Sequence, residues 1–526
     1  MTLSRSFLLG LFAAAAVGAA LAIRSRSRPG FDRLLLVLAP PAAYLALTRW
    51  FLEWMAAPAD DWNGRRLTAS IALARGNAIY ALPGDGPILS GLNGPFAVLA
   101  FLPASWFSDP TSAVIAASFI ATCLVGLASG LVIARASGRG WSLAIVLASA
   151  FALAALAMKP LRMVLMSVHA DAVGVAALIG LGAILAGKWR LRAGTAIALA
   201  VVAAWSKTLF LPAALLAPAA VEWAIEGRVR VVRRLALTIA AIGGAYAIFS
   251  LLFGVREFFH HIFAFPLESP WSSAGDRRIV AGGVAGHAVA WGAAGMEFLA
   301  YAIPFAAAGL VAWKLRRNPP PQARALLVVG ALLFPVALAG RAKMGGLENN
   351  LGLGLIFLAL AVSAWLGVAL ETGGSRLATA AIVVAVVVPA VLAFAEIRGR
   401  THVRPNPYAN PHEAAFEYSL RRRGEIYFPQ YPLATLLSEG VLYPSGVALV
   451  ESTRGRVPVP KEWVDRFLPP RLEHIVLYRF DPDSPPEHYN VADSPPGEMM
   501  RRYFPGFTRR TRVPDVPGWV AFGKEN

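Results

Sequence analysis

Two adjacent carboxylates, Asp60 and Asp61, stand directly after a long apolar run in a chain whose apolar regions contain little acid. A carboxylate shielded by helices can act as a general base and take the proton of an incoming hydroxyl. Two neighbouring carboxylates can also hold a divalent cation. The structural alternative is that an Asp caps the helix predicted over 62–76 and that Asp61 pairs with Arg65, four residues on. Function is the favoured interpretation, because one acid can cap the helix while the other does chemistry.

A second polar group lies in the segment RMVLMSVHADAV, which contains Arg162, His169 and Asp171. An imidazole and a carboxylate two residues apart at the start of an apolar helix could bind a sugar hydroxyl or a metal ion. The alternative is a capping Asp beside an interfacial His. Two ligands are weak evidence for a metal site, and the sequence leaves both interpretations open.

A single lysine, Lys207, stands in a tight turn between two apolar runs. A lysine deep in a membrane costs about 2.5–3.5 kcal/mol on insertion scales, so it needs a partner or a route to water. We expect it to bind a phosphate. The alternative is that its side chain snorkels to the interface.

The loop GRAKMGGLENNL concentrates polar side chains between two apolar runs. Its cations can clamp a phosphate, its amides can bind hydroxyls, and its two glycines allow a close approach of the backbone to a ligand. An ordinary polar loop is the alternative. The candidates here are Arg341, Lys343, Glu348, Asn349 and Asn350.

The remaining motifs say little about the chemistry of the protein. The loop 254–286 holds His260 and His261 among many aromatic residues and is expected to be an interfacial helix followed by a loop over a lipid site. No P-loop, dinucleotide-binding glycine motif, HExxH or G-x-S-x-G is present. ATP-driven and nicotinamide chemistry are therefore not supported.

The elements that carry these residues are membrane helices. The chain has 526 residues, 57% of them hydrophobic and only 15% charged, whereas a soluble protein carries about 25% charge. Apolar runs of the length that crosses a bilayer recur until about residue 396. We predict a polytopic α-helical membrane protein with about twelve transmembrane helices, over 6–23, 34–55, 112–134, 141–158, 171–187, 193–206, 209–226, 233–253, 287–313, 323–340, 350–370 and 376–396. The run 91–107 is short and broken by prolines, which predicts a re-entrant or interfacial helix.

Charge then orients the bundle. Most of the net charge of +18 precedes Arg398, which suits a membrane protein better than a nucleic-acid-binding one. With twelve spans, the arginine-rich short loops all fall on one face, which is the cytoplasmic face by the positive-inside rule. The acid pair, Lys207, the Arg341–Asn350 loop and the tail all fall on the opposite face. We therefore predict a multi-pass protein of a bacterial inner membrane with its tail in the periplasm.

The tail differs in composition from the rest of the chain. It is rich in proline, charge and aromatic residues and has no spanning run. The segment 412–424 is predicted to be a helix ended by Gly424, and EIYFP, HIVLYRF and GWVAF are predicted strands. The expected organisation is a transmembrane module over 1–397, with a first outer loop over 56–111, and a small soluble α/β domain over 398–526.

The layout resembles the glycosyltransferase C (GT-C) superfamily, which includes polyprenyl-phosphate-mannose:protein mannosyltransferases and lipid A aminoarabinose transferases. The acid pair followed by ASIALARGNAIYA resembles the first outer loop of that superfamily. GLNGPFAVLAFLPASWFSDPTSAVIAASF, RMVLMSVHADAV, WSKTLFLPAALLAP and GRAKMGGLENN are similar to later segments of it. Members of the family commonly carry an aromatic residue a few positions after the acid, as in DE-x-x-Y, whereas here WNGRR follows the pair and the next tyrosine is Tyr80.

The resemblance implies an inverting glycosyltransferase that uses a polyprenyl-phosphate-linked sugar as its donor. Asp60 or Asp61 would deprotonate a hydroxyl of a glycan, lipid or protein acceptor as that oxygen attacks the anomeric carbon. No cofactor is implied, although the acid pair could hold a divalent metal. His169, Asp171, Glu348, Asn349 and Asn350 would bind the sugar or the acceptor. The expected cations for the donor phosphate are Arg162, Lys207, Arg341 and Lys343.

Two other classes stay open. Intramembrane charge also occurs in transporters and flippases, although the halves of this chain show no repeat and its polar residues favour one face. A polymerase or ligase acting on diphosphate-linked glycans, of the O-antigen type, would also use outer loops rich in cations. Membrane lipids are partners in each case, and nucleic acid in none.

Overall fold

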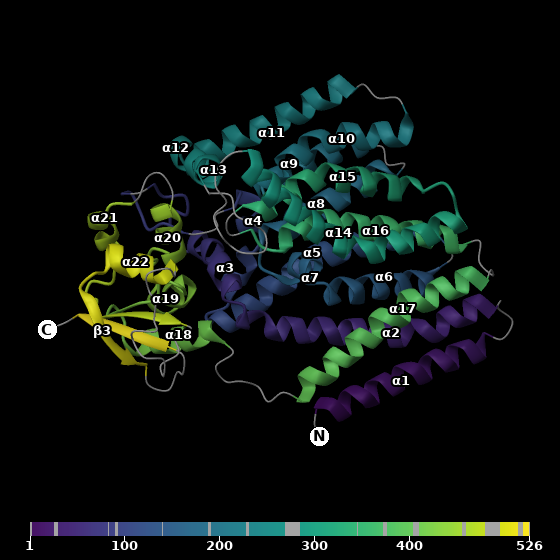
Figure 1. Cartoon of the computed structure of the whole chain (residues 1–526), viewed down its shortest axis with the longest axis horizontal. Coiled ribbons are helices and arrows are strands. Elements are labelled where there is room, and N and C mark those ends of the chain that lie inside the picture. The colour runs from purple at the N-terminus through teal and green to yellow at the C-terminus, as the bar shows by residue number, and fades with distance from the viewer. Residues whose placement is uncertain are drawn as a thin grey trace.

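A computed structural model of the chain gives the arrangement of these elements (Figure 1). It describes residues 3–25, 30–82, 84–89, 93–138, 140–187, 191–227, 231–268, 284–343, 346–371, 376–402, 410–454, 459–478, 495–513 and 519–524. A bundle of long helices carries a smaller domain at one of its ends, and the C-terminus lies in that domain.

Every segment predicted to span the membrane is helical. The bundle consists of α1 (Leu3–Arg24), α2 (Gly30–Ala56), α5 (Pro110–Ala136), α6 (Trp141–Ala157), α8 (Ala170–Leu185), α9 (Arg192–Ala204), α10 (Leu211–Glu226), α11 (Val231–Phe253), α14 (Val284–Leu315), α15 (Pro321–Ala342), α16 (Asn349–Glu371) and α17 (Arg376–His402). Within the described residues, nine helices are long and apolar enough to cross a membrane, or ten if α6 and the short α7 (Lys159–Met166), bent by 108°, form one span. α8 and α9 are shorter apolar helices. The polytopic helical class is confirmed, and the number of twelve spans stays a prediction.

The central helix of the bundle is α16. Its apolar window is 78% buried, against 11% for the window of α1 at the edge. Gly352 makes one close contact possible, since a Cβ there would lie 2.4 Å from the carbonyl oxygen of Pro160 in α7. This packing brings the first residues of α16 next to the segment between α7 and α8.

The first outer loop lies across one end of the bundle. It forms η1 (Ala57–Ala59), α3 (Asp61–Ala74), α4 (Pro95–Ala100) and η2 (Leu102–Trp106). The described part of 91–107 thus forms two short helices, neither long enough to span a membrane, and their re-entrant or interfacial placement stays a prediction. Gly94 docks this loop, because its N–H donates to the carbonyl of Ser206 at 2.9 Å and a Cβ there would lie 2.0 Å from the Trp205 carbonyl oxygen.

Short helices of the later outer loops lie at the same end. They are η3 (Thr208–Phe210), α12 (Val255–Phe259), the π-helix η4 (His260–Ala264) and α13 (Phe265–Glu268). His261 Nε2 lies 2.7 Å from the carbonyl oxygen of Ala81, so this loop packs on the first outer loop. The predicted helix after residue 254 is therefore present, and 269–283 lie outside the described residues.

The C-terminal domain is a small α/β unit. Its helices are α18 (Pro411–Arg421), α19 (Pro432–Glu439), α20 (Gly446–Arg454), α21 (Lys461–Arg466) and α22 (Pro495–Tyr503), and its strands are β1 (Ile426–Tyr427), β2 (His474–Tyr478), β3 (Phe507–Arg512) and β4 (Trp519–Lys524). The strand order is β1-β2-β4-β3, with β1 parallel to β2 and the other pairs antiparallel. Three of the four strands were predicted, whereas β3 was missed.

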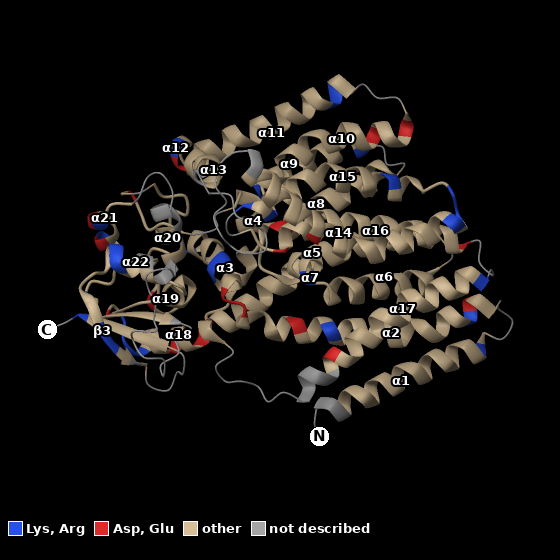
Figure 2. Ribbon diagram, viewed as in Figure 1, with Lys and Arg blue, Asp and Glu red and all other residues tan. Residues whose placement is uncertain are grey.

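Charge separates the two ends of the bundle. The described basic residues of the short loops lie at the helix ends far from the C-terminal domain (Figure 2). They are Arg24, Arg33, Arg135, Arg192, Arg233, Arg234, Lys314, Arg316, Arg317, Arg324 and Arg376. The candidate residues of the outer loops lie at the other end, beneath the C-terminal domain.

Candidate active site

The acid pair opens α3. Asp60 is the N-cap residue, and its Oδ1 accepts a hydrogen bond from the backbone N–H of Trp62 at 3.1 Å. The described residues provide no partner for its Oδ2. Asp61 Oδ2 accepts instead from Arg65 Nη2 at 2.7 Å. Both structural alternatives, the helix cap and the ion pair with Arg65, are therefore present. Each of them uses only one oxygen of its carboxylate.

A buried polar cluster is centred on Asp171 in α8. This carboxylate is fully buried. Its Oδ1 accepts from Lys207 Nζ at 2.9 Å, and its Oδ2 accepts from the side-chain amide of Asn349. His169 Nδ1 lies 2.9 Å from the same Oδ2. Asn350 Oδ1 is 3.5 Å from the Lys207 ammonium. Residues from three outer loops thus meet at the point where α8 and α16 begin.

His169 is the neutral member of this cluster. Burial lowers the pKa of His169 to about 3; the charge of Arg66 adds to the effect and that of Asp171 opposes it. A neutral imidazole can donate one hydrogen bond and accept another. The ring can therefore orient a hydroxyl beside the carboxylate without adding charge.

The loop after α15 has its own partners. Arg341 Nε donates to Glu297 Oε2 at 2.9 Å, and its Nη1 donates to the carbonyl of Gly346 at 2.7 Å. Lys343 Nζ donates to the carbonyl of Pro266 at 2.9 Å, and burial lowers the pKa of Lys343. Glu348 Oε1 accepts from Lys159 Nζ at 2.8 Å. These residues tie α14, α15 and the loop 254–268 together at the rim of the site.

Arg162 pairs with two glutamates that were not among the candidates. Its Nη1 is 3.6 Å from both Glu53 Oε1 and Glu396 Oε1. The same two carboxylates hold Arg49 of α2, which is 1% exposed. This network joins α2, α7 and α17. This network was not predicted from the sequence. Its signal was present, because Arg49, Glu53 and Glu396 are charged residues within predicted spans, where charge has a functional or structural cause.

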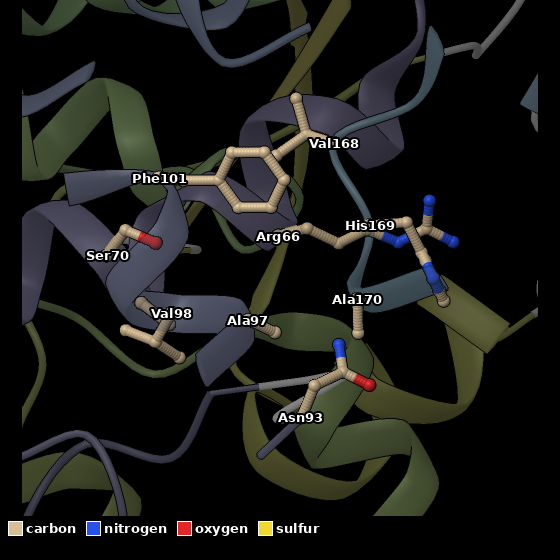
Figure 3. Close-up of a pocket in the computed structure, with 10 residues that line it drawn as sticks. Arg66, Ser70, Asn93, Ala97, Val98, Phe101, Val168, His169 and Ala170 are labelled. Carbon is tan, nitrogen blue, oxygen red and sulfur yellow. The ribbon is translucent and has the colours of Figure 1, made fainter. Parts of the chain in front are cut away.

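A small cavity lies between α3, α4 and the start of α8. Arg66, Asn93 and His169 supply polar groups to its wall, and Ala97, Val98, Phe101 and Val168 supply apolar ones. In Figure 3 the Arg66 side chain runs toward His169. Burial lowers the pKa of Arg66, and Asp60 is the carboxylate that opposes this most, followed by Asp171. The cavity therefore borders the Asp171 cluster at His169, and the charges of Asp60 and Asp171 both act on the Arg66 side chain in its wall.

Arg66 differs from the other cations at this end. Lys207, Arg341 and Arg65 each have a carboxylate partner. In the described part of the chain Arg66 makes no ion pair and only stacks on the Trp62 ring, 5.4 Å from its centroid. Arg66 lines the cavity, and without a carboxylate partner among the described residues it is better placed than Lys207, Arg341 or Arg65 to receive an anion. Arg66 was not predicted as a site residue, because one of two adjacent arginines in a helix carries no sequence signal.

The described acids of this end do not form a metal cage. Among the described residues, no group of three or more His, Cys, Asp and Glu side chains is arranged to hold a metal ion. Asp60 and Asp61 also face the cations of Arg65 and Arg66. These neighbours disfavour a divalent cation at the acid pair.

The same arrangement of helices occurs in solved structures. ArnT from Cupriavidus metallidurans, bound to undecaprenyl phosphate, superposes with a TM-score of 0.51 at 14% identity, over 91% of this chain and 97% of that one. The chain has the GT-C fold. The GT-C resemblance seen in the sequence is thereby confirmed at the level of the fold, and the chain is a multi-pass membrane protein of this type.

Other comparisons are weaker. Two structures of the Archaeoglobus fulgidus oligosaccharyltransferase, one with zinc and sulfate and one without ligands, give TM-scores of 0.44 and 0.45 at 12% identity. They cover 83% and 84% of this chain and 67% and 69% of theirs. No family model matches the sequence, and neither does any curated protein.

Proposed function

We propose that this GT-C protein is an inverting glycosyltransferase that moves a sugar from a polyprenyl-phosphate donor to a hydroxyl of a glycan, lipid or protein acceptor. The observation that carries the proposal is the cavity beside the C-terminal domain, which is lined by Arg66 and by His169 of the Asp171 cluster, while the charge of Asp60 acts on Arg66. The undecaprenyl phosphate bound to the similarly folded ArnT supports this class of donor.

Asp60 is the proposed general base. Its Oδ1 is engaged as a helix cap, which fixes the carboxylate, while Oδ2 can accept a proton. As the acceptor hydroxyl gives its proton to Oδ2, its oxygen forms a bond to the anomeric carbon. The bond from that carbon to the phosphate oxygen breaks with its electron pair, and polyprenyl phosphate leaves. Attack opposite to the leaving group inverts the configuration.

The leaving phosphate needs positive charge rather than a proton. Arg66 is the proposed first contact, since a guanidinium matches two phosphate oxygens. Lys207 is 19% exposed and can share its charge between Asp171 and a phosphate. Arg341 and Lys343 stand at the rim as further candidates, whereas Arg162 is the weaker candidate because Glu53 and Glu396 lie beside it. His169, Asn349 and Asn350 would bind the sugar around Asp171, and Glu348 stands beside them at the rim.

No metal is part of the proposed reaction, because the cations of Arg65 and Arg66 already surround the acid pair. We place the protein in a bacterial inner membrane, with the C-terminal domain in the periplasm. The basic far end of the bundle supports this orientation.

The proposed function is tested by measuring whether the protein consumes the donor. Membranes containing the protein would be supplied with a panel of undecaprenyl-phosphate sugars and a cell-envelope extract as the source of acceptor. Release of undecaprenyl phosphate would be followed by mass spectrometry. Wild type should release it and Asp60→Asn should not, while Arg376→Gln, at the far end, serves as a matched control. If wild-type membranes release none from any donor, the proposal is wrong.

A further inference from the structure

The C-terminal domain contacts the acid-bearing turn of α3 directly. Arg65 in that turn is buried, with a side chain 6% exposed. Its Nε donates to the carbonyl of Gln430 at 2.8 Å, while its Nη2 holds Asp61. The guanidinium carbon also lies 5.9 Å from the centre of the Tyr431 ring. One side chain therefore connects the acid pair to the C-terminal domain.

A second contact is a close steric fit. His412, near the start of α18, is fully buried, and its ring meets Tyr431 edge to face at 5.0 Å. A Cβ on Gly64 would lie 2.2, 2.5 and 2.7 Å from three atoms of the His412 ring. The ring thus occupies the space left by a glycine four residues after Asp60. The charged and polar groups that face it are Arg65, the Asp60 backbone and Asp61.

Contacts away from the acids hold the domain in place. The N–H of Ser445 donates to the carbonyl of Ile88 at 2.8 Å. Asn410 Nδ2 donates to Thr111 Oγ1 at 2.6 Å. The domain is therefore anchored on both the first outer loop and α5, and His412 and Arg65 form the part of the interface that reaches the acid pair.

We propose that the C-terminal domain is a positioning element of the active site: through His412 and Arg65 it fixes the first turn of α3, so that Asp60 and Asp61 are correctly oriented only when the domain is docked. This inference rests on the proposed glycosyltransferase function. His412 and Arg65 do not touch the reacting atoms in this scheme and act through the acids. Misplacing a catalytic group by about 1 Å can cost on the order of a hundredfold in rate. Losing the close contact between His412 and Gly64 should therefore lower the rate of the reaction.

The close fit between Gly64 and the His412 ring allows two variants with opposite expected effects on docking. Gly64→Ala places a methyl group inside the His412 ring and should displace the domain from α3. The double variant Gly64→Ala/His412→Ala removes the obstructing ring and should restore docking. Gly130→Ala is the matched control, because a Cβ there meets nothing within 4 Å.

Docking, lipid binding and turnover would be measured separately. A cysteine pair at Thr111 and Asn410, in a chain whose Cys123 is replaced by Ala, reports docking as disulfide formation. Native mass spectrometry with undecaprenyl phosphate reports lipid binding, and donor consumption reports turnover. Gly64→Ala should lower both cross-linking and turnover about tenfold or more while lipid binding stays within about twofold, since positioning acts on the chemical step. The double variant should recover both.

The outcomes separate the two proposals. If the wild type consumes no donor, the proposed function fails and this inference fails with it. The inference alone is overturned if the wild type is active and Gly64→Ala loses cross-linking but keeps its turnover. It is also overturned if the double variant regains cross-linking without regaining turnover, or if Gly64→Ala leaves both unchanged.

Discussion

The two neighbouring acids have different surroundings, and this assigns them different roles. Asp60 uses one oxygen to cap α3 and leaves the other for a proton, whereas Asp61 is paired with Arg65. We expect Asp60→Asn, which can still accept the capping bond, to lower donor consumption by about 10²–10⁴-fold, the usual contribution of a general base. Asp61→Asn should lose less than about tenfold, because its amide oxygen can still accept the hydrogen bond of Arg65 and so keeps the turn in place. Rates of undecaprenyl phosphate release decide this, and a larger loss in Asp61→Asn would reverse the assignment.

The buried ion pair of Lys207 and Asp171 is the second residue-level prediction. Lys207→Met leaves a fully buried carboxylate without its cation, which should destabilise the protein by about 3–5 kcal/mol. Adding Asp171→Asn should recover most of that loss, because the neutral amide no longer needs a counter-charge. The melting temperature of the detergent-purified protein measures both changes. Lys159→Met, which breaks a pair whose lysine is 54% exposed, is the control and should cost less than about 1 kcal/mol. Equal melting temperatures for Lys207→Met and the control would contradict the prediction.

Residue type and position in the chain predicted part of the candidate site. Lys207, Asp171 and Asn349 were chosen from separate segments, and the structure brings them together. The lysine was chosen because a charge between apolar runs needs a partner, and the carboxylate and the amide because they could bind hydroxyls. Arg162 was chosen as a cation for the donor phosphate from the same segment as Asp171, but it pairs with carboxylates of α2 and α17. The face of the membrane can be predicted from parity, but which helices are neighbours on that face depends on packing that no local pattern records.

At the scale of elements, α3 and α18 meet at His412, and this contact is sensitive to pH. Burial, together with the charge of Arg65, lowers the pKa of His412 to about 4 from 6.5. The unfolded chain therefore binds a proton in this range that the folded protein does not. Stability should fall as the pH decreases from 6.5 toward about 4 and should not fall further from this group below that.

Melting temperatures measured across that range test the effect. His412→Ala lacks the titrating ring, so its melting temperature should decrease less steeply than that of the wild type between pH 6.5 and 4. His169 and His261 have pKa values lowered in the same direction and contribute equally to both proteins. Parallel curves for the two proteins would exclude His412 as a source of the acid sensitivity.

The elements themselves differ in how well the sequence predicts them. Long apolar runs predicted every helix of the bundle. A backbone inside a membrane must satisfy its own hydrogen bonds, and a helix does so within one segment. In the C-terminal domain β3 was missed, since its residues 507–512 read FTRRTR. That strand is at the edge of the sheet, where charged side chains protect an exposed edge from pairing with other chains. A strand prediction that relies on apolar content therefore misses a charged edge strand such as β3.

At the scale of the whole molecule, charge and architecture both support the orientation proposed above. The described basic residues of the short loops lie at one end of the bundle, and the C-terminal domain covers the other (Figure 2). The polar cluster lies at the covered end rather than midway along the helices, where transporters place their binding sites. An acceptor made outside the cytoplasm would thus meet a membrane-borne donor beneath the domain.

This orientation makes a prediction for intact cells. In a chain whose Cys123 is replaced by Ala, a cysteine at Lys461, in the C-terminal domain, should react with a membrane-impermeant maleimide that enters the periplasm. A cysteine at Arg317, at the basic end, should react only after the inner membrane is permeabilised, because a charged reagent does not cross the hydrocarbon core. Both side chains are exposed, so access rather than burial controls labelling. The opposite labelling pattern would place the C-terminal domain in the cytoplasm, where the positive-inside rule does not put it, and the acceptor would then have to be a cytoplasmic one.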